Sequence, residues 1–163
     1  MEPDSTQQQP LCSPEPPVFK RILLPIDDDF DLSQRAVSTG LMMARLCNAQ
    51  LVTLHAIPPF NSLACMSVML AATEMEYCDQ AIKDSAKRLA QVKRMANAAH
   101  VACECHHSFG EHPYEAILAA ATEHHCDLIV MASHGRRGLD RLMLGSETQK
   151  VLSMGTTPVL VCR

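Results

Sequence analysis

A chain of 163 residues has about the size of one domain, because a single hydrophobic core organises roughly 100–200 residues. Its net charge of -4 argues against a nucleic-acid partner, which needs a clustered basic face. The longest apolar stretch, Leu63 to Ala72, is far shorter than the roughly 20 residues of a membrane span, so we expect no membrane partner. The eight cysteines are scattered and no signal peptide precedes them, which predicts reduced thiols and a cytoplasmic protein.

The first 17 residues form a proline- and glutamine-rich segment with few large apolar side chains. Such a segment buries too little surface to offset the entropy of ordering it. We therefore expect a disordered tail at 1–17 and a single domain at 18–163.

From Phe19 onward, apolar runs alternate with helical patterns, which predicts parallel βαβ units in an α/β fold. The third strand has mixed polarity and is expected at a sheet edge, whereas the fourth is the most apolar and is expected near the centre. In chain order, the elements expected are strand 21–26, helix 32–46, strand 50–57, helix 73–99, strand 101–109, helix 114–124, strand 126–132, helix 146–154 and strand 158–162. A side chain at Asp29, Asp31 or Ser33 is expected to cap the first helix.

Two strand ends carry residues suited to ligand binding. Asp27 follows the first strand, and Ala132-Ser133-His134-Gly135 follows the fourth, nine residues before Gly145-Ser146 opens a helix. In open parallel sheets, ligands bind beyond the carboxyl ends of strands where the strand order reverses. Small residues and a helix N-terminus there favour a phosphate group, with Arg136, Arg137 and Arg141 adding positive charge. The loop alone fits a simple turn with an N-cap equally well.

The chain from Phe19 to its end resembles the universal stress protein family. The matching segments are KRILLPID at 20–27, LHA at 54–56, GEHP at 110–113, DLIVMASHGRRGL at 127–139, LGS at 144–146 and TPVLV at 157–161. The resemblance implies an open five-stranded parallel sheet of order 3-2-1-4-5 with helices on both faces, a Rossmann-like fold. It also implies a homodimer formed through the C-terminal strand 158–162.

Nucleotide-binding members of that family carry Gly-x2-Gly-x9-Gly-Ser/Thr. The corresponding positions here are Ala132, Gly135, Gly145 and Ser146, so one glycine is replaced by alanine. The resemblance implies binding of ATP, with Asp27 beside the adenosine. The carboxylates of Asp27, Asp28 and Asp29 suggest Mg²⁺ as a companion ion beside the phosphates, with a solvated strand end as the default interpretation. The nucleotide-binding residues so expected are Pro25, Ile26, Asp27, Ala56, Met131, Ala132, Ser133, His134, Gly135, Arg136, Gly145, Ser146 and Glu147.

Two further groups of residues invite a chemical role. Strand alternation puts Cys103, Cys105 and His107 on one face, but no second ligand pair follows at zinc-site spacing, so we expect no metal site. The pair His124-His125 is interpreted as complementing the negative end of a helix dipole. The combination of Ser133, His134 and Asp27 lacks a nucleophile elbow and predicts no catalytic residues.

Three function classes follow. The first is a regulatory, ATP-binding stress protein. The second is an enzyme, either a slow ATPase or a signalling protein that becomes phosphorylated. Efficient phosphoryl transfer is not expected, because the sequence has no P-loop lysine motif. The third is a nucleotide-free dimeric adaptor, for which Ala132 is the argument.

Overall fold

The computed structural model describes residues 19–60, 69–133 and 144–163. The segment expected as a tail, and with it His134, Gly135 and Arg136 of the expected site, lies outside these residues. The elements are β1 (Arg21–Ile26), α1 (Phe30–Cys47), β2 (Gln50–Ile57), α2 (Met69–Ala98), β3 (Cys103–Phe109), α3 (Pro113–Glu123), β4 (Leu128–Ala132), α4 (Ser146–Met154) and β5 (Val159–Cys162).

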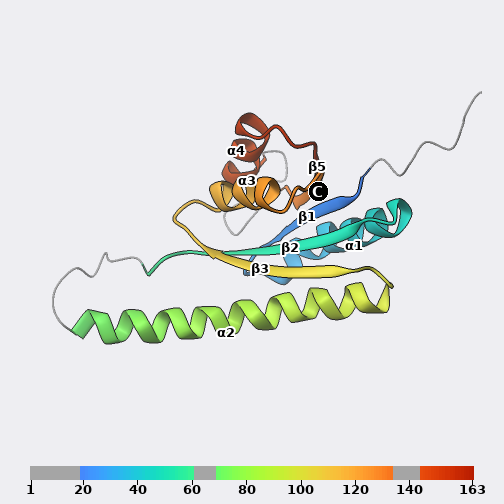
Figure 1. The fold of residues 1–163 in the computed structure, drawn as a ribbon. Coiled ribbons are helices and arrows are strands. Elements are labelled where there is room, and N and C mark those ends of the chain that lie inside the picture. The colour runs from blue at the N-terminus through green and yellow to red at the C-terminus, as the bar shows by residue number, and fades with distance from the viewer. Residues whose placement is uncertain (1–18, 61–68, 134–143) are drawn as a thin grey trace, which may run out of the picture.

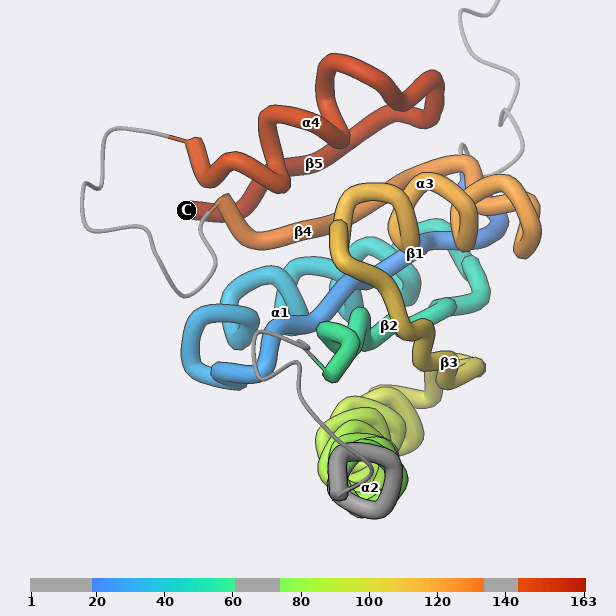
Figure 2. The backbone as a smooth tube through the Cα atoms, turned by 90° about the vertical axis from the view of Figure 1, so that its left-hand side faces the viewer, coloured from blue at the N-terminus to red at the C-terminus, as the bar shows by residue number. Residues whose placement is uncertain are grey.

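All strand pairs in the sheet are parallel, and the order is β3-β2-β1-β4-β5. This confirms the α/β fold and the strand order expected from the resemblance. In Figure 2, α3 and α4 lie above the sheet and α1 and α2 below it. The long α2 runs along β3 in Figure 1.

Two hydrophobic clusters fill the space between the sheet and its two helix layers. Because successive side chains of a strand point to opposite faces, Leu24 joins the cluster on the α1–α2 face and Leu23 joins the cluster on the α3–α4 face. Both leucines are fully buried. At Gly40, α1 lies so close to the sheet that an added Cβ would come within 3.3 Å of Leu24 Cδ1.

The element boundaries differ from expectation by a few residues, for local reasons. Helix α1 begins at Phe30 because the Asp29 side chain accepts a hydrogen bond from the Asp31 N–H, which makes Asp29 the cap. Strand β3 begins at Cys103 because the Val101 N–H still bonds to the Ala96 carbonyl at the end of α2. Neither shift changes which strand ends share an edge.

Candidate functional site

The ends of β1, β2 and β4 meet at one edge of the sheet. Strand β1 lies between β2 and β4, and Ile26 pairs with His55, so the next residues, Asp27 and Ala56, lie level with each other. On the other side, Leu23 pairs with Ile129, and continuing this register brings Ile26 level with Ala132. Figure 2 shows the end of β1, the chain's C-terminus and the starts of α1 and α4 along the left of the view. The structure therefore brings together the two strand ends that the sequence singled out.

Hydrogen bonds attach the start of α4 to the end of β4. The Gly145 N–H donates to the Ser133 carbonyl at 2.8 Å. The Thr148 hydroxyl lies 3.2 Å from the Ala132 carbonyl and 3.4 Å from the Ser133 carbonyl. Ser133 and Thr148 are both buried. The two ends of the loop that connects β4 to α4 are thus held next to each other.

The first turn of α4 has no side-chain cap among the described residues. Gly145 occupies the N-cap position with φ -59 and ψ 151, and no side chain accepts a hydrogen bond there. The Glu147 carboxylate instead accepts a hydrogen bond from the Tyr114 N–H at 2.9 Å, at the start of α3. Because the first N–H groups of a helix lack partners within the helix, this end of α4 can accept an anion.

Ala132, the departure from the family's glycine pattern, is the last residue of β4. It is not among the described residues with positive φ, so alanine causes no backbone strain at this position. Its methyl group packs against the cluster on the α1–α2 face.

A compact turn follows β1. The Asp27 N–H donates to Ser33 Oγ at 2.9 Å, and the Asp29 N–H donates to Asp27 Oδ1 at 3.3 Å. Asp27 is half-buried, and a carboxylate has about four acceptor positions, so it retains capacity to accept hydrogen bonds from a ligand.

Three further residues expected in the nucleotide site, Pro25, Ile26 and Met131, offer mainly backbone groups to that edge of the sheet. Ile26 and Met131 are buried in the core, each with 6% exposure, and Pro25 pairs with Leu54 inside the sheet. Only the main-chain groups of Ile26 and Met131 are placed to meet a ligand at the edge.

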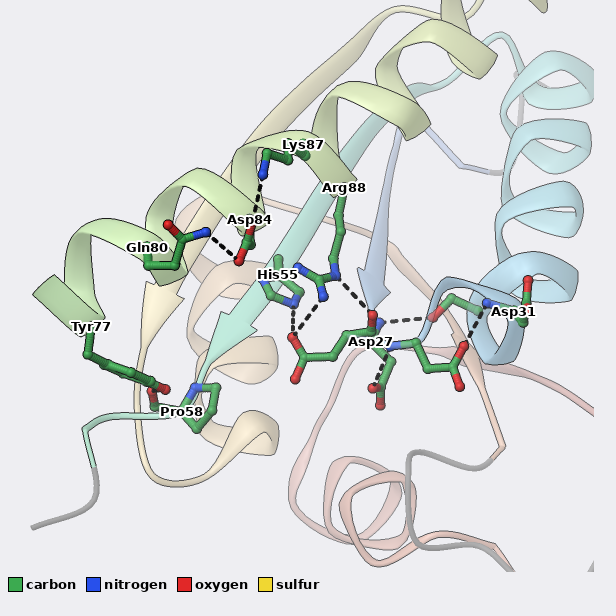
Figure 3. Close-up of polar contacts among 12 residues, drawn as sticks. Asp27, Asp31, His55, Pro58, Tyr77, Gln80, Asp84, Lys87 and Arg88 are labelled. Carbon is green, nitrogen blue, oxygen red and sulfur yellow. Dashed lines mark hydrogen bonds and ion pairs between the residues drawn. The ribbon is translucent and has the colours of Figure 1, made fainter. Parts of the chain in front are cut away.

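A second polar network at this edge was not found by sequence reasoning. His55 on β2 is buried, and its Nε2 lies 3.2 Å from Asp28 Oδ1. Arg88 on α2 donates from Nε to the Asp28 carbonyl at 2.9 Å. Figure 3 shows Arg88 reaching from α2 toward the turn that contains Asp27. The sequence did hold a signal for this network: a histidine inside an apolar strand is expected to be buried, and a buried polar side chain requires a hydrogen-bond partner. The network ties the turn after β1 to α2 and so fixes the position of Asp27.

This network borders a cavity of about 220 Å³ between β2 and α2, lined by Asp28, His55, Tyr77, Asp84 and Arg88 among others. Tyr77 donates from its hydroxyl to the Pro58 carbonyl at 3.0 Å, and Lys87 forms an ion pair with Asp84 (Figure 3). Most polar side chains of the walls are therefore engaged with one another, although His55 Nδ1 is buried and has no hydrogen-bond partner among the described residues.

Burial lowers the pKa of His55 below its ordinary value, and this effect exceeds the opposing influence of the Asp28 carboxylate. The folded chain then binds a proton at His55 more weakly than the unfolded chain. The free energy of unfolding should consequently fall as the pH drops below about 6.5, the ordinary histidine pKa.

Urea denaturation at pH 7.5 and pH 5.5 measures this effect. The loss of unfolding free energy between the two pH values should be smaller in His55→Gln than in the native chain. The exposed His107, changed to Gln, is the control and should leave that loss unchanged. An equal loss in His55→Gln and the native chain would contradict the assignment.

The six cysteines in the described part of the chain are free thiols. Cys103 and Cys105 pack against the cluster on the α1–α2 face, and burial together with the neighbouring Cys105 raises the pKa of Cys103 to about 12. His107 is exposed. A thiol with such a pKa is protonated at neutral pH.

Within the described residues, no helix is both long and apolar enough to cross a membrane.

The chain belongs to the universal stress protein family, whose model matches residues 19–163. It is 32% identical over 150 residues to the universal stress protein YxiE of Bacillus subtilis, a match covering 90% of this chain and 100% of that protein.

Solved structures show the same fold. The universal stress protein UspA of Lactobacillus plantarum superposes with a TM-score of 0.76 at 24% identity, covering 88% of this chain and 97% of that one. A universal stress protein of Archaeoglobus fulgidus in complex with dAMP superposes with a TM-score of 0.65 at 18% identity, covering 89% of this chain and 96% of that one.

Proposed function

We propose that this universal stress protein binds ATP at the edge where β1 and β4 end, and acts as a nucleotide-dependent regulatory protein of the stress response. The observation that carries the proposal is the position of α4. Its uncapped N-terminus is held against the end of β4, at the place where the strand order reverses. This arrangement offers N–H donors to phosphates at the usual ligand position of open parallel sheets. The dAMP complex of the Archaeoglobus fulgidus relative supports the choice of an adenine nucleotide.

The adenosine lies beside Asp27 and Ala56, and the phosphates lie on the first turn of α4. The Asp27 carboxylate accepts hydrogen bonds from the nucleoside. The N–H groups of Ser146 and Glu147 donate to phosphate oxygens, while the Glu147 carboxylate stays with α3. The family pattern adds Gly135 to the phosphate side, and the wider resemblance to the family adds His134 and Arg136.

Mg²⁺ is the proposed companion ion because it binds triphosphate oxygens and usually keeps several waters. Slow hydrolysis of ATP fits the proposal, but efficient phosphoryl transfer does not, because the sequence has no P-loop lysine motif. The proposed location is the cytoplasm.

Titration calorimetry with ATP tests the proposal on the native chain and on Ala132→Gly. Both should bind one ATP per chain. The glycine variant should bind at least as tightly, because it removes one methyl group near the proposed site and the native alanine already fits without backbone strain. GTP, with the same phosphates and a different base, should bind more weakly at both. Binding by Ala132→Gly but not by the native chain would establish the nucleotide-free adaptor; binding by neither would reject the site.

The proposed assembly is a homodimer formed through the strand 158–162. Strand β5 lies at one end of the sheet, and in the described part of the chain no strand pairs with its outer edge. A short apolar edge of this kind is readily covered by a second copy of the same strand.

A further inference from the structure

A cluster of polar side chains lies at the opposite end of the sheet from the proposed nucleotide site. All strands are parallel, so they begin together, at the right of Figure 1. There Arg21 pairs with Gln50, and Val52 pairs with Glu104 on β3. The Glu104 carboxylate accepts hydrogen bonds from Gln50 Nε2 at 2.6 Å and from Arg21 Nη2 at 3.0 Å. These two donors fix the position of the carboxylate.

Two histidines complete the cluster. His106 is two residues beyond Glu104 on β3 and therefore shares its face. His124 is the C-cap residue of α3, the helix that packs over this side of the sheet. The centroids of the two imidazole rings are 4.1 Å apart, and His106 Nε2 lies 3.7 Å from Glu104 Oε2.

The three side chains are arranged as metal ligands would be. One nitrogen from each histidine and one carboxylate oxygen of Glu104 all lie within 4.8 Å of one another. Zinc bonds of about 2.0–2.2 Å place tetrahedral ligands roughly 3.4 Å apart, so small side-chain rotations would close the site. His106 Nε2 is buried and, in the described part of the chain, has no hydrogen-bond partner. A bound cation would give this nitrogen the partner that buried polar atoms normally have.

The surroundings of Glu104 are compatible with a cation. A ligating carboxylate is commonly held by further hydrogen bonds, as Gln50 and Arg21 hold this one. The Arg21 guanidinium adds an unfavourable positive charge beside the site, because its Nη2 lies 3.0 Å from Glu104 Oε2.

We propose that Glu104, His106 and His124 form a zinc-binding site at the amino end of the sheet, with the fourth coordination position left to water or a small ligand. Two imidazoles and one carboxylate are a known donor set for zinc sites with an open position. The side chains of His106 and Glu104 are 36% and 42% exposed, so the site lies at the surface although His106 Nε2 itself is buried. The site uses none of the residues proposed to bind ATP.

Titration calorimetry with ZnCl₂ tests this on the full chain after chelation and removal of the chelator, in buffer without nucleotide. The native chain should bind one zinc ion. His106→Ala and His124→Ala should each weaken binding by about 100-fold or more, and Gln50→Ala, which removes a support of Glu104, by about 10-fold. Circular dichroism should show that the variants fold.

The sequence supplies matched controls, because each proposed histidine has a histidine neighbour. His107→Ala and His125→Ala remove exposed rings that are not in the cluster, and both should bind zinc like the native chain. The double variant Cys103→Ser/Cys105→Ser should also bind normally, and Co²⁺ in place of zinc should give no thiolate-to-metal charge-transfer band. Three outcomes would each overturn the proposal. They are no zinc binding by the native chain, loss of binding in the cysteine or His107 variants, and normal binding in both His106→Ala and His124→Ala.

Discussion

Gly145→Asp should abolish ATP binding while leaving the chain folded. Gly145 is the N-cap of α4, and its φ of -59 and ψ of 151 are open to any residue. Aspartate is among the best N-cap residues, so the substitution should stabilise the helix. The new carboxylate would accept hydrogen bonds from the N–H groups that are proposed to bind the phosphates. Its negative charge would also repel the phosphates. Two unit charges 4 Å apart repel by about 4 kcal/mol at an effective dielectric constant near 20, which corresponds to roughly a thousand-fold loss of affinity.

The control for this variant is Gly145→Ser, which also caps the helix but adds no charge. It should lose much less affinity than Gly145→Asp in the same titration. Urea denaturation should find both variants at least as stable as the native chain. ATP binding of native strength by Gly145→Asp would show that the phosphates do not lie at the start of α4.

Val161→Pro should convert the proposed homodimer to a monomer. The Ile129 and Ser133 N–H groups donate to the carbonyls of Pro158 and Cys162. Because the hydrogen-bonding direction alternates along a strand, the backbone groups of Val159 and Val161 point to the free edge of β5. Proline at 161 removes an outward N–H and obstructs a second strand there. Light scattering at micromolar concentration should give the mass of two chains for the native protein and of one for the variant.

Val161→Ala keeps the N–H and should stay dimeric. Proline at Leu160 would be a poorer test, because the backbone of that residue faces β4 and the substitution would damage the sheet itself. A native chain that is monomeric at micromolar concentration, or a Val161→Pro variant that is still dimeric, would contradict pairing through β5.

Sequence patterns predicted β1 and β2 well because each is a short, largely apolar run ended by a charged residue or a proline, at Asp27 and Pro58. The strand order came from the resemblance to the family, since local patterns do not specify which strands pair. The sequence also left three candidates for the cap of α1. Only the hydrogen bond from the Asp31 N–H identifies Asp29.

The relations that the sequence missed join residues far apart in the chain. Glu147 is in the expected nucleotide site, but its carboxylate contacts Tyr114 on α3, 33 residues away. His124 follows α3, and its proximity to His106 depends on how that helix packs on the sheet. Reasoning along β3 alone grouped Cys103, Cys105 and His107, which lie on the other face. Side-chain clusters of this kind follow from tertiary packing and have no local signal.

An amide chemical-shift titration of the isotope-labelled chain with ATP shows which end of the sheet the nucleotide contacts. If ATP binds where β1 and β4 end, the largest shifts should fall on Asp27, Ala56 and the residues from Gly145 to Thr148, while Glu104 and His106 at the other end of the sheet stay unchanged. Absence of shifts at millimolar ATP, or shifts confined to the amino end of the sheet, would contradict binding at the proposed site.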